Sequence, residues 1–434
     1  MQSFSSMSNI TSRARRRFLA TIILASMALL GPLPVSAESS AAQHPARWVT
    51  AFGTSQQPNI IPVTINNATI RMIARVSIPG NSIRIRLDNT FGQAPVTIGS
   101  AFAGPRVQGA RLAEGYNKQV TFNGSTQVVI PVGGSVVSDP IGLRVFARQD
   151  VGVSLHLPGV NVNPSQHTSA VVTSYLSANG SGDVSSDVTP TPYTGTTTSM
   201  LLLKSIDVLS STSRGAIVAF GDSITDGTCT TLDAHNRWED WVSVKLDTMD
   251  DDEGPQQLRD KAMVNEGIGG NTLTRNGLQP PPDSIPGIER LDRDVLSHSS
   301  VTHVVLFMGT NDIRREASAA QVIDAMKAII QRVKAKGLKI YGVTIIPRHN
   351  VAASGTNTGW SPAKTAIRNQ VNRWIRTSGQ FDDVLDFDRV VLDPNNPDLI
   401  YAPFNCGDGI HPSPAGYYEM GKEVDLDLFR SQRR

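Results

Sequence analysis

The pattern of apolar residues changes at Gly215, and this change limits the folds that the chain can adopt. Between about Trp48 and Val208, short runs of alternating apolar and polar residues are broken by Gly, Asn, Asp and Pro, as around residues 69–78. Alternation of this kind is typical of antiparallel strands with one buried face. Many short strands at close spacing predict an all-β sandwich, jelly-roll-like, over residues 46–210.

From residue 213 onward, continuous apolar runs alternate with helical patterns. The first run, GAIVAFG at 215–221, is typical of a strand that is buried on both faces of a parallel sheet. Residues 319–336 place their apolar side chains on one helical face, and Ser361 followed by Pro362 indicates the start of another helix. Strands that alternate with helices predict a doubly wound α/β domain with a parallel sheet over 213–434.

The first 37 residues have the features of an export signal. Three arginines at 15–17 precede an apolar stretch at 18–30, and small residues follow at 35–37. The arginines followed by Phe and Leu resemble a twin-arginine signal, with an ordinary Sec signal as the alternative. Without the four arginines of this segment, 36 basic residues face 38 acidic ones, which argues against binding to nucleic acid or to an anionic membrane. We therefore expect a secreted protein that is soluble after cleavage.

Polar residues follow the predicted strands in four short blocks. These are GDSITDG at 221–227, NEGIGGN at 265–271, GTND at 309–312 and DGIHPS at 408–413. Ligands of doubly wound sheets bind at the carboxyl ends of the strands, so we expect the blocks to meet at one edge. In order and spacing they resemble the blocks of the SGNH, or GDSL, hydrolases, from roughly residue 215 to the C-terminus. The resemblance implies a flavodoxin-like three-layer fold and a carboxylic ester hydrolase.

Ser223, His411 and Asp408 are the residue types that nucleophilic catalysis needs. A serine hydroxyl becomes an effective nucleophile when a neighbouring base removes its proton. His411 is the best candidate base among the eight histidines, because Asp408 three residues earlier can reach its ring and fix the tautomer. The resemblance implies the same roles, with no metal or organic cofactor required. We expect Asp222 and Asp312 to be local hydrogen-bonding supports rather than catalysts.

The resemblance also implies an oxyanion hole. Its donors would be the backbone N–H groups of Ser223 and Gly270 and the side-chain amide of Asn311. Gly270 suits this role because a missing Cβ lets a substrate approach the backbone. Gly267 and Gly269 remain alternatives for the same role.

The chain has two cysteines, Cys229 and Cys406, which lie close in sequence to the predicted catalytic residues. Cys229 is six residues after Ser223, and Cys406 is five residues before His411. If the serine and the histidine converge, the cysteines converge as well, so we predict a disulfide in an oxidising compartment. Two free buried thiols are the alternative. The pair is not part of the family resemblance.

Some residues outside the four blocks also have predicted roles. Trp238 and Trp241 are expected on the core face of a helix rather than as platforms for sugars. His349 and Trp360 flank a loop after a predicted strand, where they either contact substrate or are incidental. Residues 177–199, rich in Ser, Gly, Thr and Pro, are expected to form a long surface loop or linker.

The N-terminal half resembles a bacterial and fungal subgroup of the SGNH family in which a β-sandwich precedes the hydrolase. TIRMIARVSIPGNSIRIRLDNTFG at 69–92 is one such segment. Some members of the subgroup are associated with breakdown of plant cell-wall polysaccharides, which implies deacylation, chiefly deacetylation, of a carbohydrate or another small acyl ester. The alternatives are a lipase or lysophospholipase acting on longer acyl chains, and a glycan-binding protein with a vestigial hydrolase domain. The oligomeric state stays open.

Overall fold

The computed structural model describes residues 45–58, 63–248, 261–275, 285–355 and 357–430. The predicted export signal at 1–37 lies outside these residues. The described residues all belong to one compact unit. Within them, no helix combines the length and the apolar character that a membrane crossing requires.

The described residues from 45 to 210, which we call the β region, form antiparallel sheets and contain no helix. One sheet has the order β1 (Arg47–Gly53), β15 (Leu203–Ser210), β3 (Ser82–Asp88) and β9 (Ser135–Val137). A second has the order β13 (Gly195–Thr197), β12 (Ser174–Leu176), β2 (Ala68–Val76), β10 (Gln149–Leu157), β5 (Ser100–Gln108) and β6 (Arg111–Leu112), with β7 (Lys118–Gln119) on β5. Two further pairs join β4 (Val96–Ile98) to β8 (Val128–Ile130) and β11 (Gln166–His167) to β14 (Met200–Leu201). Because β2 contacts both β1 and β15, the apolar faces of the two main sheets share a core.

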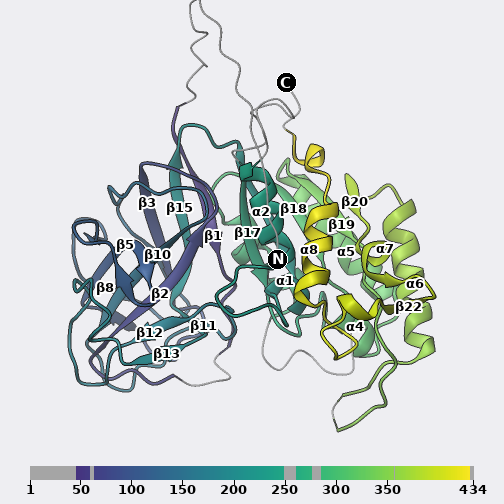
Figure 1. Cartoon of the computed structure of the whole chain (residues 1–434), viewed down its shortest axis with the longest axis horizontal. Coiled ribbons are helices and arrows are strands. Elements are labelled where there is room, and N and C mark those ends of the chain that lie inside the picture. Colours follow the sequence, from purple (N-terminus) through teal and green to yellow (C-terminus); the bar gives the residue numbers. More distant parts are fainter. Residues whose placement is uncertain (1–44, 59–62, 249–260, 276–284, 356, 431–434) are drawn as a thin grey trace, which may run out of the picture. The chain divides into compact units, whose positions relative to one another are not determined.

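The second half of the chain contains a parallel sheet with helices on both faces (Figure 1). The strand order is β17 (Lys261–Gly267), β16 (Gly215–Gly221), β18 (Val301–Phe307), β19 (Lys339–Val343) and β20 (Asp383–Leu385). The helices are α1 (Ser223–Asp226), α2 (Trp238–Thr248), α3 (Gly287–Leu291), α4 (Thr310–Arg314), α5 (Ala319–Ala335), α6 (Pro362–Thr377), α7 (Phe387–Val391) and α8 (Pro414–Glu423). Short elements complete the region: helical turns η1 (Asp292–Leu296), η2 (Ala402–Phe404) and η3 (Leu426–Phe429), and the hairpin strands β21 (Leu392–Asp393) and β22 (Asn396–Ile400). The order is flavodoxin-like, which confirms the predicted α/β fold.

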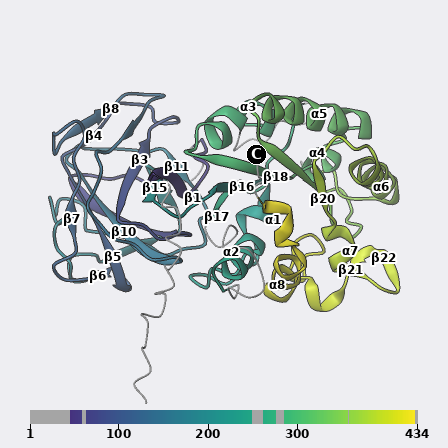
Figure 2. The same ribbon diagram turned by 90° about the horizontal axis from the view of Figure 1, so that it is seen from above.

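Alternation along β16 divides its side chains between two cores. Val218 and Phe220 belong to the core that includes α3 and α5. Ile217 and Ala219 belong to the core that includes α2 and α8. Figure 2 shows these two pairs of helices on opposite faces of the sheet. Burial on both faces explains why the sequence of β16 is continuously apolar.

The antiparallel and parallel sheets meet edge to edge. β1 contacts β17, and the Thr50 N–H donates to the Ser299 carbonyl at 3.1 Å. The predicted boundary between 210 and 213 therefore falls inside the compact unit. The division into separate domains at 46–210 and 213–434 stays a prediction.

Two predicted helices are present, with one difference in detail. α5 begins after Ser318, whose side chain and that of Gln321 form a reciprocal cap. α6 begins at Pro362 as predicted, and Ser361 has the extended backbone of a capping residue. However, the Ser361 side chain makes no capping hydrogen bond. The fixed backbone angle of proline at the first helical position therefore marks this start without help from the serine hydroxyl.

Candidate active site

Ser223 lies at a tight turn between a buried strand and a short helix. β16 ends at Gly221, and α1 begins at Ser223. The Asp222 carboxylate caps this helix by accepting the Ile224 N–H at 3.0 Å. A Cβ at position 221 would lie 2.1 Å from Thr225 Oγ1, so the turn requires glycine there. The turn places Ser223 at the carboxyl end of the parallel sheet, where the sequence predicted chemistry.

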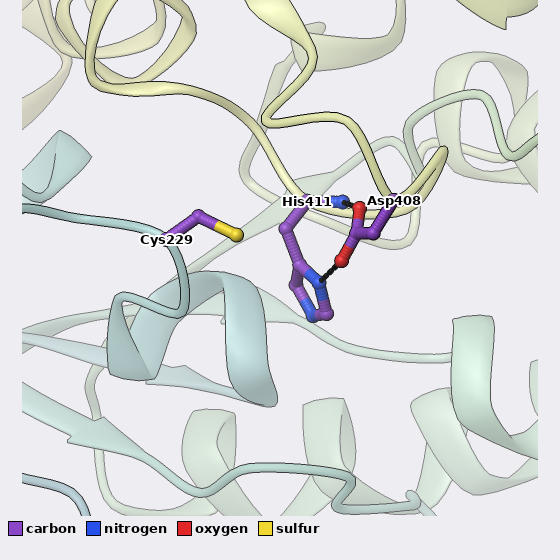
Figure 3. A group of neighbouring side chains, drawn as sticks. All are labelled: Cys229, Asp408 and His411. Atoms are coloured by element: carbon purple, nitrogen blue, oxygen red, sulfur yellow. Dashed lines mark hydrogen bonds and ion pairs between the residues drawn. The ribbon is translucent and has the colours of Figure 1, made fainter.

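Ser223, His411 and Asp408 form a hydrogen-bonded series. Ser223 Oγ lies 2.8 Å from His411 Nε2, and His411 Nδ1 lies 2.6 Å from Asp408 Oδ2. Because an ionised carboxylate only accepts hydrogen bonds, Nδ1 carries a proton and Nε2 is left to accept the hydroxyl proton. Figure 3 shows the Asp408 carboxylate against the ring of His411, from the same loop. The distances meet the geometric requirement for a nucleophile, its base and an orienting group.

The loop backbone also binds Asp408. Its Oδ1 accepts the N–H groups of Ile410 and His411, each at 2.8 Å. Burial acts to raise the pKa of Asp408, but the hydrogen bonds from the His411 ring and from the two N–H groups outweigh burial and hold the pKa below its ordinary value. The carboxylate is therefore ionised at neutral pH.

Two of the three candidate glycines have their N–H groups occupied. Gly267 donates to Asn265 Oδ1 at 2.7 Å, and Gly269 donates to Asp226 Oδ2 at 2.9 Å. Among the described residues, the N–H of Gly270 has no acceptor. Gly270 has φ +70°, and a Cβ there would meet nothing within 4 Å. Of the three, Gly270 is thus the one whose N–H is unoccupied among the described residues, and its missing Cβ leaves the space beside its Cα open.

The two other predicted oxyanion donors each have a hydrogen without an acceptor among the described residues. The Ser223 N–H, at the start of α1, has no acceptor among the described residues. The Asn311 side-chain amide donates one hydrogen to the Asn271 carbonyl at 3.1 Å. This bond ties Asn311 to the residue after Gly270 and leaves the second amide hydrogen for a ligand.

A disulfide joins Cys229 to Cys406, with Cα atoms 6.2 Å apart. The Cys229 sulfur lies beside the His411 ring (Figure 3), and these groups with Asp408 fall within 4.8 Å of one another. Metal ions in proteins bind a thiolate, whereas this sulfur is bonded to another sulfur. The grouping therefore reflects a covalent link beside His411, not a set of metal ligands.

His349 supports the loop that carries His411. Its N–H donates to the Gly409 carbonyl at 2.8 Å, and its Nε2 lies 3.4 Å from Asn405 Nδ2. Trp360, by contrast, is only 3% exposed, and its Nε1 donates to Thr365 Oγ1 at 3.0 Å. Trp360 therefore belongs to the core and has little exposed surface left.

The tryptophans of α2 differ in burial. Trp238 is fully buried and packs edge-on against Phe387. Trp241 is half-buried and packs edge-on against Tyr418 of α8. Both therefore hold α2 against its neighbours, as expected from the sequence.

The two aspartates beside the predicted catalytic blocks bind backbone groups. Asp312 accepts the N–H groups of Leu273 and Thr274, at 2.9 and 3.1 Å, and Asp222 caps α1. Burial raises the pKa of each to about 7. Both are local supports, as expected.

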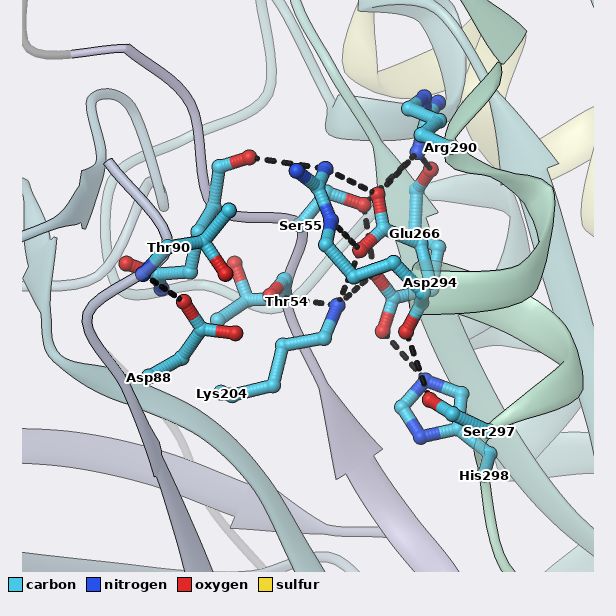
Figure 4. A network of polar contacts seen from close by, with 12 residues as sticks. Thr54, Ser55, Asp88, Thr90, Lys204, Glu266, Arg290, Asp294, Ser297 and His298 are labelled. Atoms are coloured by element: carbon cyan, nitrogen blue, oxygen red, sulfur yellow. Dashed lines mark hydrogen bonds and ion pairs between the residues drawn. The ribbon is translucent and has the colours of Figure 1, made fainter. Parts of the chain in front are cut away.

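The sequence did not single out a buried polar network beneath the site (Figure 4). Lys204, from the β region, lies 2.9 Å from Glu266 Oε2 and 2.7 Å from Asp294 Oδ1. Arg290 contacts Asp294 at 3.2 Å and donates to the Gly221 carbonyl at 2.9 Å. Glu266 stands within a recognised block, but its partners are remote in sequence, so no local pattern could reveal the network.

Comparison with known proteins identifies the family of the second half. The sequence pattern of the GDSL-like lipase/acylhydrolase family matches residues 219–418. No curated protein sequence matches the chain. A solved carbohydrate acetylesterase from Sinorhizobium meliloti is similar with a TM-score of 0.36 and 18% identity, over 49% of this chain and 97% of that one. An aryl esterase from M. smegmatis is similar with a TM-score of 0.35 and 19% identity, over 48% of this chain and 94% of that one. Residues 219–418 are a GDSL-like lipase/acylhydrolase domain, and through it the chain is a carboxylic ester hydrolase.

Proposed function

We propose that the chain hydrolyses esters in two acyl-transfer steps, with Ser223 as nucleophile, His411 as general base and acid, and Asp408 as the group that orients His411. The observation that carries this proposal is the continuous hydrogen-bonded series from Ser223 Oγ through both ring nitrogens of His411 to Asp408. Such a series supplies a proton acceptor at the hydroxyl and a carboxylate that stabilises the imidazolium.

In the first step, Ser223 Oγ bonds to the ester carbonyl carbon and its proton passes to His411 Nε2. The tetrahedral intermediate expels the alcohol, which takes the proton from Nε2 and leaves the acyl group on Ser223. In the second step, water transfers a proton to Nε2 as it attacks the acyl carbon. Collapse of that intermediate returns the proton to Ser223 Oγ and releases the carboxylic acid.

Both intermediates carry a negative charge on the former carbonyl oxygen. The proposed donors to it are the N–H groups of Ser223 and Gly270 and the free amide hydrogen of Asn311. Each preorganised donor of this kind contributes about 10²–10³ in rate. The free state of the two N–H groups among the described residues supports this assignment.

The proposed substrate is a small acyl ester of a carbohydrate, with acetyl as the favoured acyl group. Tyr401 and Phe404, with ring centroids 5.2 Å apart, form an edge-on aromatic pair on the segment that leads to His411. Tyr401 is 37% exposed, and an exposed ring offers an apolar face to a sugar. The Ser413 hydroxyl donates to the Pro403 carbonyl at 2.8 Å, which ties this segment to the loop of the base.

A substrate panel on wild type and Ser223→Ala tests the proposal. We expect acetate release from acetylated xylan, and kcat/KM for a short-chain p-nitrophenyl ester at least about tenfold above that for a long-chain ester. Ser223→Ala should lower kcat by about 10⁴ or more. Preference for long chains would instead identify a lipase. Glycan binding by both proteins without turnover by either would identify a binding protein.

Export is part of the proposed function. The signal-like segment at 1–37 supports it, as does the disulfide, because disulfides persist in oxidising compartments. In fractionated cells, we expect a product outside the cytoplasm that lacks the first 37 residues. Replacing Arg15 and Arg16 together by lysine should stop export if the route is the twin-arginine one. Uncleaved protein confined to the cytoplasm of wild-type cells would contradict export.

A further inference from the structure

One side chain of the β region reaches α1, the short helix that begins with Ser223. His167, in β11, is 2% exposed, and its Nε2 lies 3.0 Å from Asp226 Oδ1. Asp226 is 6% exposed and is the last residue of α1, the helix that begins with Ser223. The contact therefore joins the β region to α1, the helix that carries Ser223, at a buried point.

Both ring nitrogens of His167 face oxygen atoms that accept hydrogen bonds. Nδ1 lies 2.8 Å from the Ser55 carbonyl oxygen, and Nε2 faces the Asp226 carboxylate. Each nitrogen must carry a proton to make these bonds, so the ring is a cation. Burial acts to lower the pKa of His167, but Asp226 and the Ser55 carbonyl outweigh burial and raise it, although Arg237 opposes them. His167 and Asp226 thus form a buried ion pair.

The second oxygen of Asp226 holds the loop that carries Gly270. Asp226 Oδ2 accepts the Gly269 N–H at 2.9 Å, and the next N–H along the chain is the free donor of Gly270. Gly270 has no side chain that could fix its position by packing. The direction of its N–H therefore depends on hydrogen bonds made by the residues on either side.

Arg290 holds the same loop from the other side. Its Nε donates to Asn271 Oδ1 at 3.0 Å, and its Nη1 donates to Ser55 Oγ at 2.8 Å. Ser55 thus contacts both anchors: its carbonyl faces His167 Nδ1, and its hydroxyl accepts from Arg290, as Figure 4 shows for Ser55 and Arg290. Ser55 lies just after β1, so one residue of the β region contacts both side chains that hold the loop.

We propose that the β region positions the oxyanion loop, residues 269–271, and that His167 is the positioning residue through which it directs the Gly270 N–H. The inference rests on the proposed function, in which that N–H binds the oxyanion. His167 acts on the oxyanion loop through Asp226, which in turn accepts the Gly269 N–H. Losing its contact should therefore slow acyl transfer and leave substrate binding nearly unchanged.

A matched pair of substitutions separates this role from a purely structural one. In His167→Gln, the amide reaches the place of Nε2 and keeps a donor for Asp226. In His167→Asn, the amide takes the place of Nδ1 and keeps only the bond to Ser55. We expect His167→Asn to lower kcat by about tenfold to a hundredfold with KM within about threefold, and His167→Gln to stay within about threefold of wild type.

Two further variants complete the experiment. Thr50→Val removes buried hydrogen bonds to Asp207 and Ser299 without touching the loop, so it should lower the melting temperature and leave kcat unchanged. Ser223→Ala, measured alongside, tests the proposed function by itself. If Ser223→Ala is inactive and His167→Asn has the same kcat as His167→Gln, the positioning role is wrong. If Ser223→Ala stays active, the proposed function fails instead.

Discussion

At the scale of single residues, the proposed function gives the amide group of Asn311 two tasks. One hydrogen binds the Asn271 carbonyl at 3.1 Å and so holds the loop next to Gly270. The other is free to meet negative charge on a substrate oxygen. Asn311 is 6% exposed, so water competes weakly for that hydrogen.

Asn311→Ala is therefore expected to affect the transition state more than substrate binding. We predict a fall in kcat of about 10²–10³, with KM changed by less than about threefold. Steady-state kinetics with a short-chain p-nitrophenyl ester measures both constants. A kcat within about threefold of wild type would remove Asn311 from the oxyanion hole.

The shifted pKa of Asp222 should make the stability of the folded protein depend on pH. Its folded-state pKa is about 7, whereas an unperturbed aspartate has a pKa of about 3.9. Between these values the unfolded chain has lost the proton that the folded chain keeps, so this group makes the free energy of unfolding fall as pH rises from about 4 to about 7. Asp222→Asn keeps an oxygen for the Ile224 N–H but does not titrate.

We predict that wild type loses more stability than Asp222→Asn between pH 5 and pH 8, as measured by urea unfolding at both pH values. Asp324→Asn serves as the control, because this side chain is 72% exposed on α5. Identical pH dependence in wild type and Asp222→Asn would contradict the buried, protonated state of Asp222.

At the scale of elements, the disulfide ties the loop after α1 to the loop before His411. It closes a sequence separation of 177 residues. Its sulfur lies beside His411, so the covalent link and the proposed triad share one small region. A cross-link that closes a long loop stabilises the folded protein mainly by restricting the unfolded chain.

Replacing both cysteines by serine should lower the free energy of unfolding by about 2–5 kcal/mol. Denaturant unfolding of wild type, with and without reductant, and of the Cys229→Ser/Cys406→Ser variant gives the comparison. Reduced wild type should match the double variant. An unchanged unfolding midpoint in both would show that the link adds no stability.

Elements whose signals are local could be predicted from the sequence. The apolar run at 215–221 corresponds to β16, and Pro362 marks the start of α6. Elements that pack against residues remote in the sequence could not be predicted in this way. Residues 177–199 were expected as a surface loop or linker, yet parts of this segment cover β2, where Tyr193 stacks on the buried Arg71 at 4.1 Å.

The residues of the candidate site also differ in whether a local sequence signal predicts them. Ser223, Asn311 and His411 stand in short blocks with recognisable neighbours. Trp360 was an open candidate for substrate contact, and only the fold shows that it is buried. His167 carried no signal, because its partner Asp226 is 59 residues away and in the other half of the chain.

At the scale of the whole molecule, the β region does more than add a second core. β1 covers the edge of the parallel sheet at β17, and Lys204 and Ser55 enter the buried network beneath the nucleophile turn. A buried ion costs free energy unless every partner is in place, so the two halves should be coupled in folding. The positioning role proposed for the β region rests separately on the contacts from His167 to Asp226 and from Asp226 to Gly269.

Labelling with a serine-reactive alkyl phosphonate, followed by peptide mass spectrometry, is the sharpest test of Ser223 as a nucleophile activated by His411. We predict one adduct, on Ser223, in wild type. We also predict none in Ser223→Ala, and labelling of His411→Ala slowed by at least about 10². Labelling of a different residue in wild type, or equal labelling rates with and without the His411 imidazole, would show that these roles are wrong.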